Sequence, residues 1–152
     1  MVRTPRWLDS KGWIGMDIGI KRQISVAIEN QPGRLGQIGR LLAEKGIHIS
    51  AFSVIDNVEQ AMVRLVTDDS TAARIALQFA GLPVVEVDVL VIEMTDDIGS
   101  LALIGETLAA ADINIEYAYS STATIGNRGR LIVKTANPRA AQSVLVALSG
   151  KQ

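Results

Sequence analysis

The pattern of apolar and polar residues changes period near residue 30, and this change predicts a strand followed by a helix. Apolar and polar residues alternate along residues 23–29, as in a strand with one buried face. After Pro32 the apolar period becomes helical, with Asn30 suited to the N-cap and Gly46 to the C-terminal stop. The strand is expected to bury Ile24, Val26 and Ile28, and the helical stripe holds Leu35, Ile38, Gly39 and Leu42.

Two strands are expected after this helix, at residues 47–55 and 60–67. Between them, Asp56 and Asn57 are typical of a turn. In the first of these strands, the positions expected to face the core are Ile47, Ile49 and Ala51.

A second helix and a long β-branched run follow. Asp69 or Ser70 is suited to cap the helix, and Gly81 is suited to end it. The run at residues 84–94 is longer than an ordinary strand. We therefore divide it near Asp88, so that its first half closes one unit and its second half opens another.

The pattern that begins at Gly33 recurs 66 residues later, at Gly99. Eight of the 17 positions from Gly33 to Ile49 carry the same residue in the second copy, where chance would give about one or two, so the chain contains a duplication. For the second copy we expect helices at residues 99–111 and from Pro138, with strands at residues 113–122 and 130–135.

Each unit is therefore predicted to have the order βαββαβ, the ferredoxin-like arrangement of the α+β class, with an antiparallel sheet and both helices on one face. The expected division is an N-terminal extension at residues 1–20, a first domain at residues 21–88 and a second at residues 89–152. The second domain apparently lacks its fourth strand, because only Lys151 and Gln152 follow Gly150. We hypothesise that residues 13–18 fill that position, in this chain or in a neighbouring copy.

Composition excludes several classes of function. The net charge is -1, so no overall field draws nucleic acid or an anionic membrane to the protein. The absence of cysteine excludes disulfides and thiol chemistry. No apolar run reaches membrane-spanning length, and the first twenty residues lack the apolar segment of a signal peptide, so we expect a cytoplasmic location.

Candidate catalytic groups are few. His48 is the one histidine, and a polar role on the sheet surface explains it better than catalysis. The carboxylate pairs at residues 68–69 and 96–97 each precede a predicted helix, where negative charge complements the helix dipole. We therefore predict no enzyme activity, no metal site and no cofactor.

The glycines after the first strand need a separate interpretation. The spacing of Gly33, Gly36 and Gly39 matches neither the dinucleotide fingerprint nor a phosphate-binding P-loop. Close packing of the helix is the favoured explanation for Gly36 and Gly39. Gly33 lies in the first turn beside Arg34, among free backbone N–H groups, which predicts a modest site for one carboxylate.

At these residues the chain resembles the ACT domain family. The segment Asn30-Gln31-Pro32-Gly33-Arg34-Leu35, the helix after it and the strand entry at residues 46–49 match that family's hallmark. The likeness covers about residues 21–148, and is strongest to small stand-alone tandem ACT proteins. The second unit departs from the motif, because Ile98 replaces the proline.

The resemblance implies a non-catalytic regulatory protein that binds a small ligand, an amino acid, between ACT units and modulates a partner enzyme of amino-acid metabolism, as a homodimer. The residues of the loop before the first helix would hold the carboxylate group of the ligand. The ammonium would pair with Asp96, Asp97 or Glu116. The ligand-binding residues implied are Asn30, Pro32, Gly33, Arg34, Leu35, Ala51, Phe52, Ser53, Asp96, Asp97, Gly99, Tyr117 and Tyr119.

Packing between units is an equal explanation for the aromatic members Phe52, Tyr117 and Tyr119. The alternative function is a structural, protein-interaction ACT module that no longer binds a ligand. The lost proline at Ile98 and the missing final strand favour this alternative.

Overall fold

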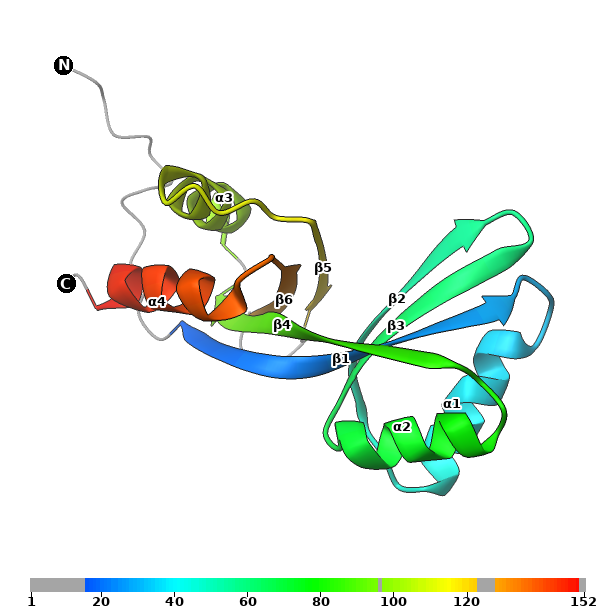
Figure 1. Ribbon diagram of the computed structural model, residues 1–152. Coiled ribbons are helices and arrows are strands. Elements are labelled where there is room, and N and C mark those ends of the chain that lie inside the picture. The colour runs from blue at the N-terminus through cyan, green and yellow to red at the C-terminus, as the bar shows by residue number, and fades with distance from the viewer. Residues whose placement is uncertain (1–15, 96, 123–127, 151–152) are drawn as a thin grey trace, which may run out of the picture. The chain divides into compact units, whose positions relative to one another are not determined.

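The computed structural model describes residues 16–95, 97–122 and 128–150, which contain six strands and four helices (Figure 1). The strands are β1 (Asp17–Glu29), β2 (Ile49–Asn57), β3 (Gln60–Thr67), β4 (Val84–Thr95), β5 (Tyr117–Thr122) and β6 (Arg128–Lys134). The helices are α1 (Arg34–Glu44), α2 (Ser70–Phe79), α3 (Ser100–Ala110) and α4 (Pro138–Ser149). The described chain forms two compact units, one of residues 21–88 and one in which residues 16–20 join the described residues from Val89 onward.

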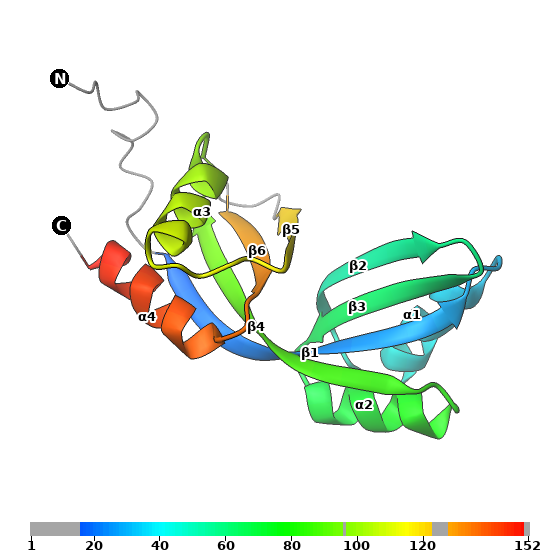
Figure 2. The ribbon, with the colours of Figure 1, turned by 45° about the horizontal axis from the view of Figure 1, so that its top comes forward.

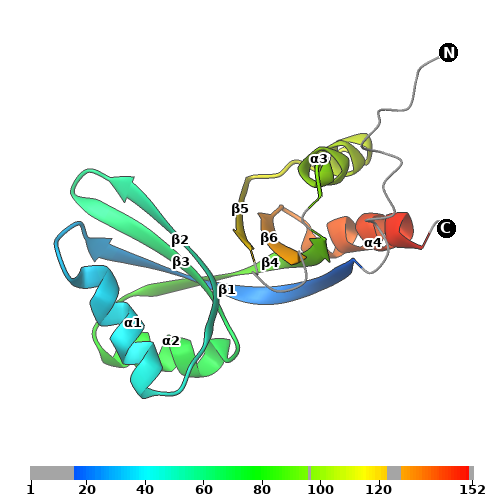
Figure 3. The same ribbon diagram turned by 180° about the vertical axis from the view of Figure 1, so that it is seen from behind.

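The unit of residues 21–88 has the strand order β2-β3-β1-β4. Strand β3 runs antiparallel to both neighbours, with Glu29 opposite Gln60 on one side and Val54 opposite Val63 on the other. Helices α1 and α2 lie on the same side of these strands (Figures 1 and 3). One core fills the space between them, formed by Ile24, Val26, Ile28, Ile38, Leu42, Ile47, Ala61, Val63, Leu65, Ala73, Ala76 and Leu77.

The other unit has the order β1-β4-β6-β5, so that it also holds four strands. Strand β6 runs antiparallel to β4 and to β5, with Ile132 opposite both Val91 and Tyr119. Helices α3 and α4 contact each other in this unit, and Figure 2 shows them beside the strands of the same unit. Both helices contribute to a single core, formed by Ile18, Leu90, Ile92, Met94, Ile104, Leu108, Val133, Ala141 and Leu145.

The start of β1 therefore supplies the fourth strand of this unit. Ile18 is only 8% exposed and belongs to the core, and Met16 and Ile20 pack against it. The side-chain amide of Gln142 on α4 donates to the carbonyl oxygen of Ile18 over 2.9 Å. Residues 13–15 of the hypothesised segment lie outside the described residues. In the described part, residues 17–20 complete the unit within the same chain.

Both long strands thus serve two units. The first residues of β1 act as the fourth strand of one unit, and residues 21–29 act as the first strand of the other. In strand β4, the residues up to Asp88 belong to the unit of residues 21–88, and the residues from Val89 belong to the other unit. The run that was expected to be divided near Asp88 is one continuous strand. The predicted fold class, two ferredoxin-like βαββαβ units of α+β type, is confirmed.

The predicted C-terminal stop of α1 is confirmed. Gly46 has a left-handed φ of 68°, its N–H donates to Ala43 over 2.9 Å, and the N–H of Ile47 donates to Leu42 over 3.0 Å. This pair of hydrogen bonds is the Schellman arrangement. Gly81 ends α2 in the same way, and Asp112 takes the left-handed position after α3 with a φ of 58°.

Several expectations about side-chain faces and strand bounds are wrong. Leu35 is 42% exposed, because α1 begins at Arg34 and its first turn lies beyond the core. The pairing register of β2 shifts between Ile49 and Ala51, so that Ala51 pairs with Val66 and is absent from the core cluster that Ile49 packs against. Tyr117 is the first residue of β5, so residues 113–116 are not part of that strand.

The interior glycines of α1 are not required by packing. A Cβ atom built on Gly36 or Gly39 would meet no atom of the neighbouring elements within 4 Å. The close-packing explanation is therefore wrong for the described chain, and these glycines reduce the stability of α1.

Two glycine-to-alanine changes in and next to α1 are expected to have opposite effects. Gly39→Ala should stabilise the protein by roughly 0.5–1 kcal/mol, because alanine is the better helix former and the space is open. Gly46→Ala should destabilise it by roughly 1–2 kcal/mol, because alanine is strained at a φ of 68°. Urea denaturation of both variants measures the difference, and equal signs would contradict this account of α1.

Candidate functional site

The loop between β1 and α1 is held by contacts that its sequence did not predict. Asn30 does not cap α1, whose N-cap is Gly33 with no side-chain cap hydrogen bond. The side-chain amide of Asn30 donates to the Asp56 carboxylate over 2.9 Å and to the Val58 carbonyl oxygen over 3.4 Å. Its backbone N–H donates to the carbonyl oxygen of Glu59 over 3.2 Å. Asn30 therefore ties the loop to the β2–β3 turn, and the expectation that it is the N-cap is wrong.

The residue at the N-cap of α1 is Gly33, with a left-handed φ of 88° and no side-chain hydrogen bond to the helix. The N–H groups of the first helical turn have no intrahelical acceptors. Together with the helix dipole, they favour an anion in front of them. By contrast, Asp69 caps α2 and Asn137 caps α4, each through its side-chain oxygen.

An open hollow of about 640 Å³ lies at the start of α1. Arg34 and Arg40 add positive charge to it, and Gly33 and Gly36 leave the helix backbone accessible. Its full lining is Gln31, Pro32, Gly33, Arg34, Gly36, Gln37 and Arg40. The arrangement is suited to a carboxylate.

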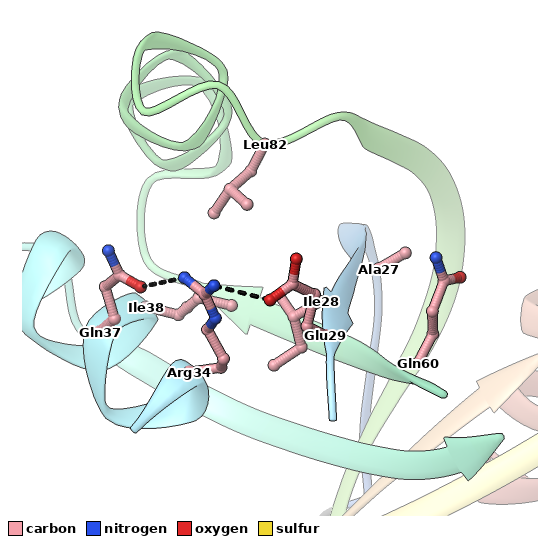
Figure 4. Close-up of a pocket in the computed structure, with 8 residues that line it drawn as sticks. All are labelled: Ala27, Ile28, Glu29, Arg34, Gln37, Ile38, Gln60 and Leu82. Atoms are coloured by element: carbon pink, nitrogen blue, oxygen red, sulfur yellow. Dashed lines mark hydrogen bonds and ion pairs between the residues drawn. The ribbon is translucent and has the colours of Figure 1, made fainter. Parts of the chain in front are cut away.

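A second hollow, of about 240 Å³, lies beside the first and shares Arg34 with it. The guanidinium of Arg34 donates to the Glu29 carboxylate over 2.6 Å and to the Gln37 side-chain oxygen over 3.4 Å (Figure 4). Leu82, from the segment after α2, points toward this pair. The hollow is lined by Ala27, Ile28, Glu29, Arg34, Gln37, Ile38, Gln60 and Leu82.

The equivalent loop before α3 has different chemistry. Gly99 is the N-cap there, with a φ of 93°, but Ser100 stands where the first unit has Arg34. Asp97, which was expected to complement the helix dipole, precedes α3, and its carboxylate accepts a hydrogen bond from the Thr95 hydroxyl over 2.6 Å. Asp96 lies outside the described residues. No side chain of the described residues caps α3 either.

The remaining candidate residues lie away from the first loop. Ala51, Phe52 and Ser53 lie on β2, and none of them lines the two hollows at the start of α1. Phe52 is 57% exposed, whereas Ala51 is buried. Tyr117 and Tyr119 lie half-buried on β5, in the other unit.

Of the eight residues that line the smaller hollow, sequence reasoning named only Arg34 as a site residue, and missed seven, among them Glu29, Gln37 and Leu82. Glu29 and Arg34 are opposite charges five positions apart across a predicted turn, a signal that could have identified the pair. Leu82 carried no local signal, because it follows α2 and reaches the hollow only through the tertiary fold.

Three other expectations concern features outside this loop. His48 is exposed at the entry to β2, and its backbone N–H donates to the Asp68 carboxylate over 3.0 Å. In the part of the chain that the structure describes, no three His, Asp or Glu side chains gather as metal ligands would. The described helices are all too short or too polar to span a membrane.

These features define the class of protein: a pair of ferredoxin-like units in which a glycine-started helix follows the first strand of each unit. The model of the ACT domain pair family matches residues 18–150, and the chain belongs to that family. No curated protein matches the chain.

Solved structures show the same fold. Protein BT0572 from Bacteroides thetaiotaomicron is 27% identical with a TM-score of 0.79, over 86% of this chain and 90% of that one. The ligand-free regulatory subunit of aspartate kinase from Thermus thermophilus is 19% identical with a TM-score of 0.66, over 90% and 98%. The corresponding subunit from Thermus flavus is 22% identical with a TM-score of 0.62, over 90% and 98%.

Proposed function

We propose that this protein is a non-catalytic regulator that binds an amino acid at the loop between β1 and α1 and modulates a partner enzyme of amino-acid metabolism. The observation that carries the proposal is the start of α1. Gly33 leaves the helix N-terminus without a side-chain cap, and Arg34 adds a positive charge beside it. That geometry is suited to the carboxylate of a small zwitterion.

The family supports a regulatory role, and regulatory subunits of aspartate kinase share the fold. We also propose that the protein forms a homodimer. Strand β2 is at the edge of its sheet and exposes Phe52, an apolar surface that a second copy could cover. In that arrangement the exposed part of β2 of the second copy, with Phe52 and Ser53, would border the ligand.

A thermal-shift screen of the whole chain against the twenty amino acids tests the proposal. An amino acid present at a hundred times its dissociation constant should add about 2.7 kcal/mol to the free energy of unfolding. For a chain of this size, that corresponds to a rise in Tm of roughly 5–10 °C. If none of the twenty raises Tm, the amino-acid sensor is rejected in favour of an interaction module.

A further inference from the structure

We propose that Glu29 and Arg34 together recognise the charged groups of an amino acid with a compact aliphatic side chain, and that the hollow behind them holds that side chain. The inference rests on the proposed function, because it names the ligand class and the recognition residues of the same site. The carboxylate of Glu29, in the first unit, would bind the ammonium group of the ligand.

The charges lie at the rim of the 240 Å³ hollow, and its floor is apolar. The side chains of Arg34 and Glu29 are 42% and 60% exposed. Ile28 and Ile38, which line the same hollow, are 8% and 2% exposed. Leu82 completes the apolar wall from the segment after α2 (Figure 4). A molecule with two charges at one end and a hydrocarbon at the other matches this distribution.

The size of the hollow limits the ligand. Pockets for drug-sized molecules are roughly 300–1,000 Å³, so a hollow of about 240 Å³ takes something smaller. A single amino acid with a branched aliphatic side chain satisfies both the volume and the apolar floor. A nucleotide exceeds this space.

Arg34 links the two hollows. It lines both the apolar hollow and the open one at the start of α1, where Gly33 leaves the helix uncapped. A carboxylate between the two hollows would reach the guanidinium and the first-turn N–H groups together. The ammonium would then take the place of Arg34 as the partner of Glu29. Exposed ion pairs contribute little to stability, so separating Glu29 from Arg34 is a small obstacle.

The duplication supplies an internal comparison. At the equivalent positions of the other unit, Thr95 replaces Glu29 and Ser100 replaces Arg34. The hollow there, of about 160 Å³, is lined by both of these neutral side chains and by Arg130, which pairs with Glu93 instead. The ion pair between the end of the first strand and the start of the helix is thus present in the first unit and replaced in the second, which favours one such site per chain.

The test compares L-leucine with two analogues that each lack one charge, 4-methylpentanoate and 3-methylbutylamine, by titration calorimetry on the whole chain. L-Leucine should bind at least tenfold more tightly than either analogue. Glu29→Gln should weaken L-leucine binding at least tenfold. The same change should leave 4-methylpentanoate binding equal or tighter, because Arg34 is released and no ammonium needs a partner.

Glu44→Gln is the matched control, an exposed carboxylate on the last turn of α1, and should bind all three compounds as the unchanged protein does. If L-leucine binds and Glu29→Gln binds it equally well, this inference is overturned while the proposed function stands. If other amino acids bind and L-leucine does not, this inference is likewise overturned while the proposed function stands. If no amino acid binds, the proposed function fails as well.

Discussion

Replacing Ile18 with aspartate should unfold the unit that contains residues 89–150. Ile18 is 8% exposed in the core that includes Leu90 and Leu145. The change removes a buried aliphatic side chain and places a carboxylate in its position, at a combined cost of roughly 3–5 kcal/mol. A unit of this size has a stability near the lower end of the usual 5–15 kcal/mol range, so most of it would be lost.

Amide hydrogen exchange read by mass spectrometry measures this effect, peptide by peptide. Peptides that contain Leu90 or Leu145 should lose protection in Ile18→Asp. Asp17→Ala is the control, because the Asp17 side chain is exposed on the neighbouring position of β1. Unchanged protection of both core peptides in Ile18→Asp would mean that the start of β1 does not serve as the fourth strand.

Local signals predicted the element order well, because they depend on short-range chemistry. The strand at residues 60–67 has the predicted bounds, and Asp69 caps α2 as expected. The left-handed positions after the first two helices carry glycine, the residue that the conformation favours, and so Gly46 and Gly81 were visible in the sequence.

Predictions failed where a distant part of the chain decided the outcome. The Asn30 amide is bound by Asp56 and Val58, far along the sequence, rather than by its own helix. A shift in register within β2 removes Ala51 from the core cluster, and no local pattern marks that shift. By contrast, the hypothesis that residues 13–18 supply the fourth strand of one unit is confirmed for the described residues 17–18, and the assembled sheet shows that they come from the same chain.

The same limit applies to the candidate site. The loop residues Pro32, Gly33 and Arg34 were predicted from a motif, and they do line a hollow at the start of α1. Glu29, Gln37 and Leu82 were missed, because the hollow that they line joins a strand, a helix and the segment after another helix. Cavities of this kind depend on tertiary structure rather than on spacing along the chain.

Replacing Gly33 with valine should abolish tight amino-acid binding while leaving both cores intact. The φ of 88° at Gly33 is strongly unfavourable for a β-branched residue. A Cβ atom there would meet nothing within 4 Å, so the effect comes from the backbone and not from a clash. The variant loop would relax to another conformation, and binding would have to restore the strained one at a cost of roughly 1–3 kcal/mol.

The control is Gly46→Val, which places the same side chain at a left-handed φ of 68° just past the other end of α1. It carries a similar strain but lies outside both hollows. Its amino-acid affinity should equal that of the unchanged protein, at a temperature where each variant is folded. A loss of affinity confined to Gly33→Val would separate the loop's role in binding from its role in stability.

The most direct measurement is a calorimetric titration of the whole chain and of both valine variants with the amino acid that gives the largest rise in Tm. We expect binding to the unchanged protein and to Gly46→Val, and an affinity at least tenfold lower for Gly33→Val, equivalent to about 1.4 kcal/mol. Equal affinities for the unchanged protein and Gly33→Val would contradict the claim that the start of α1 binds the carboxylate.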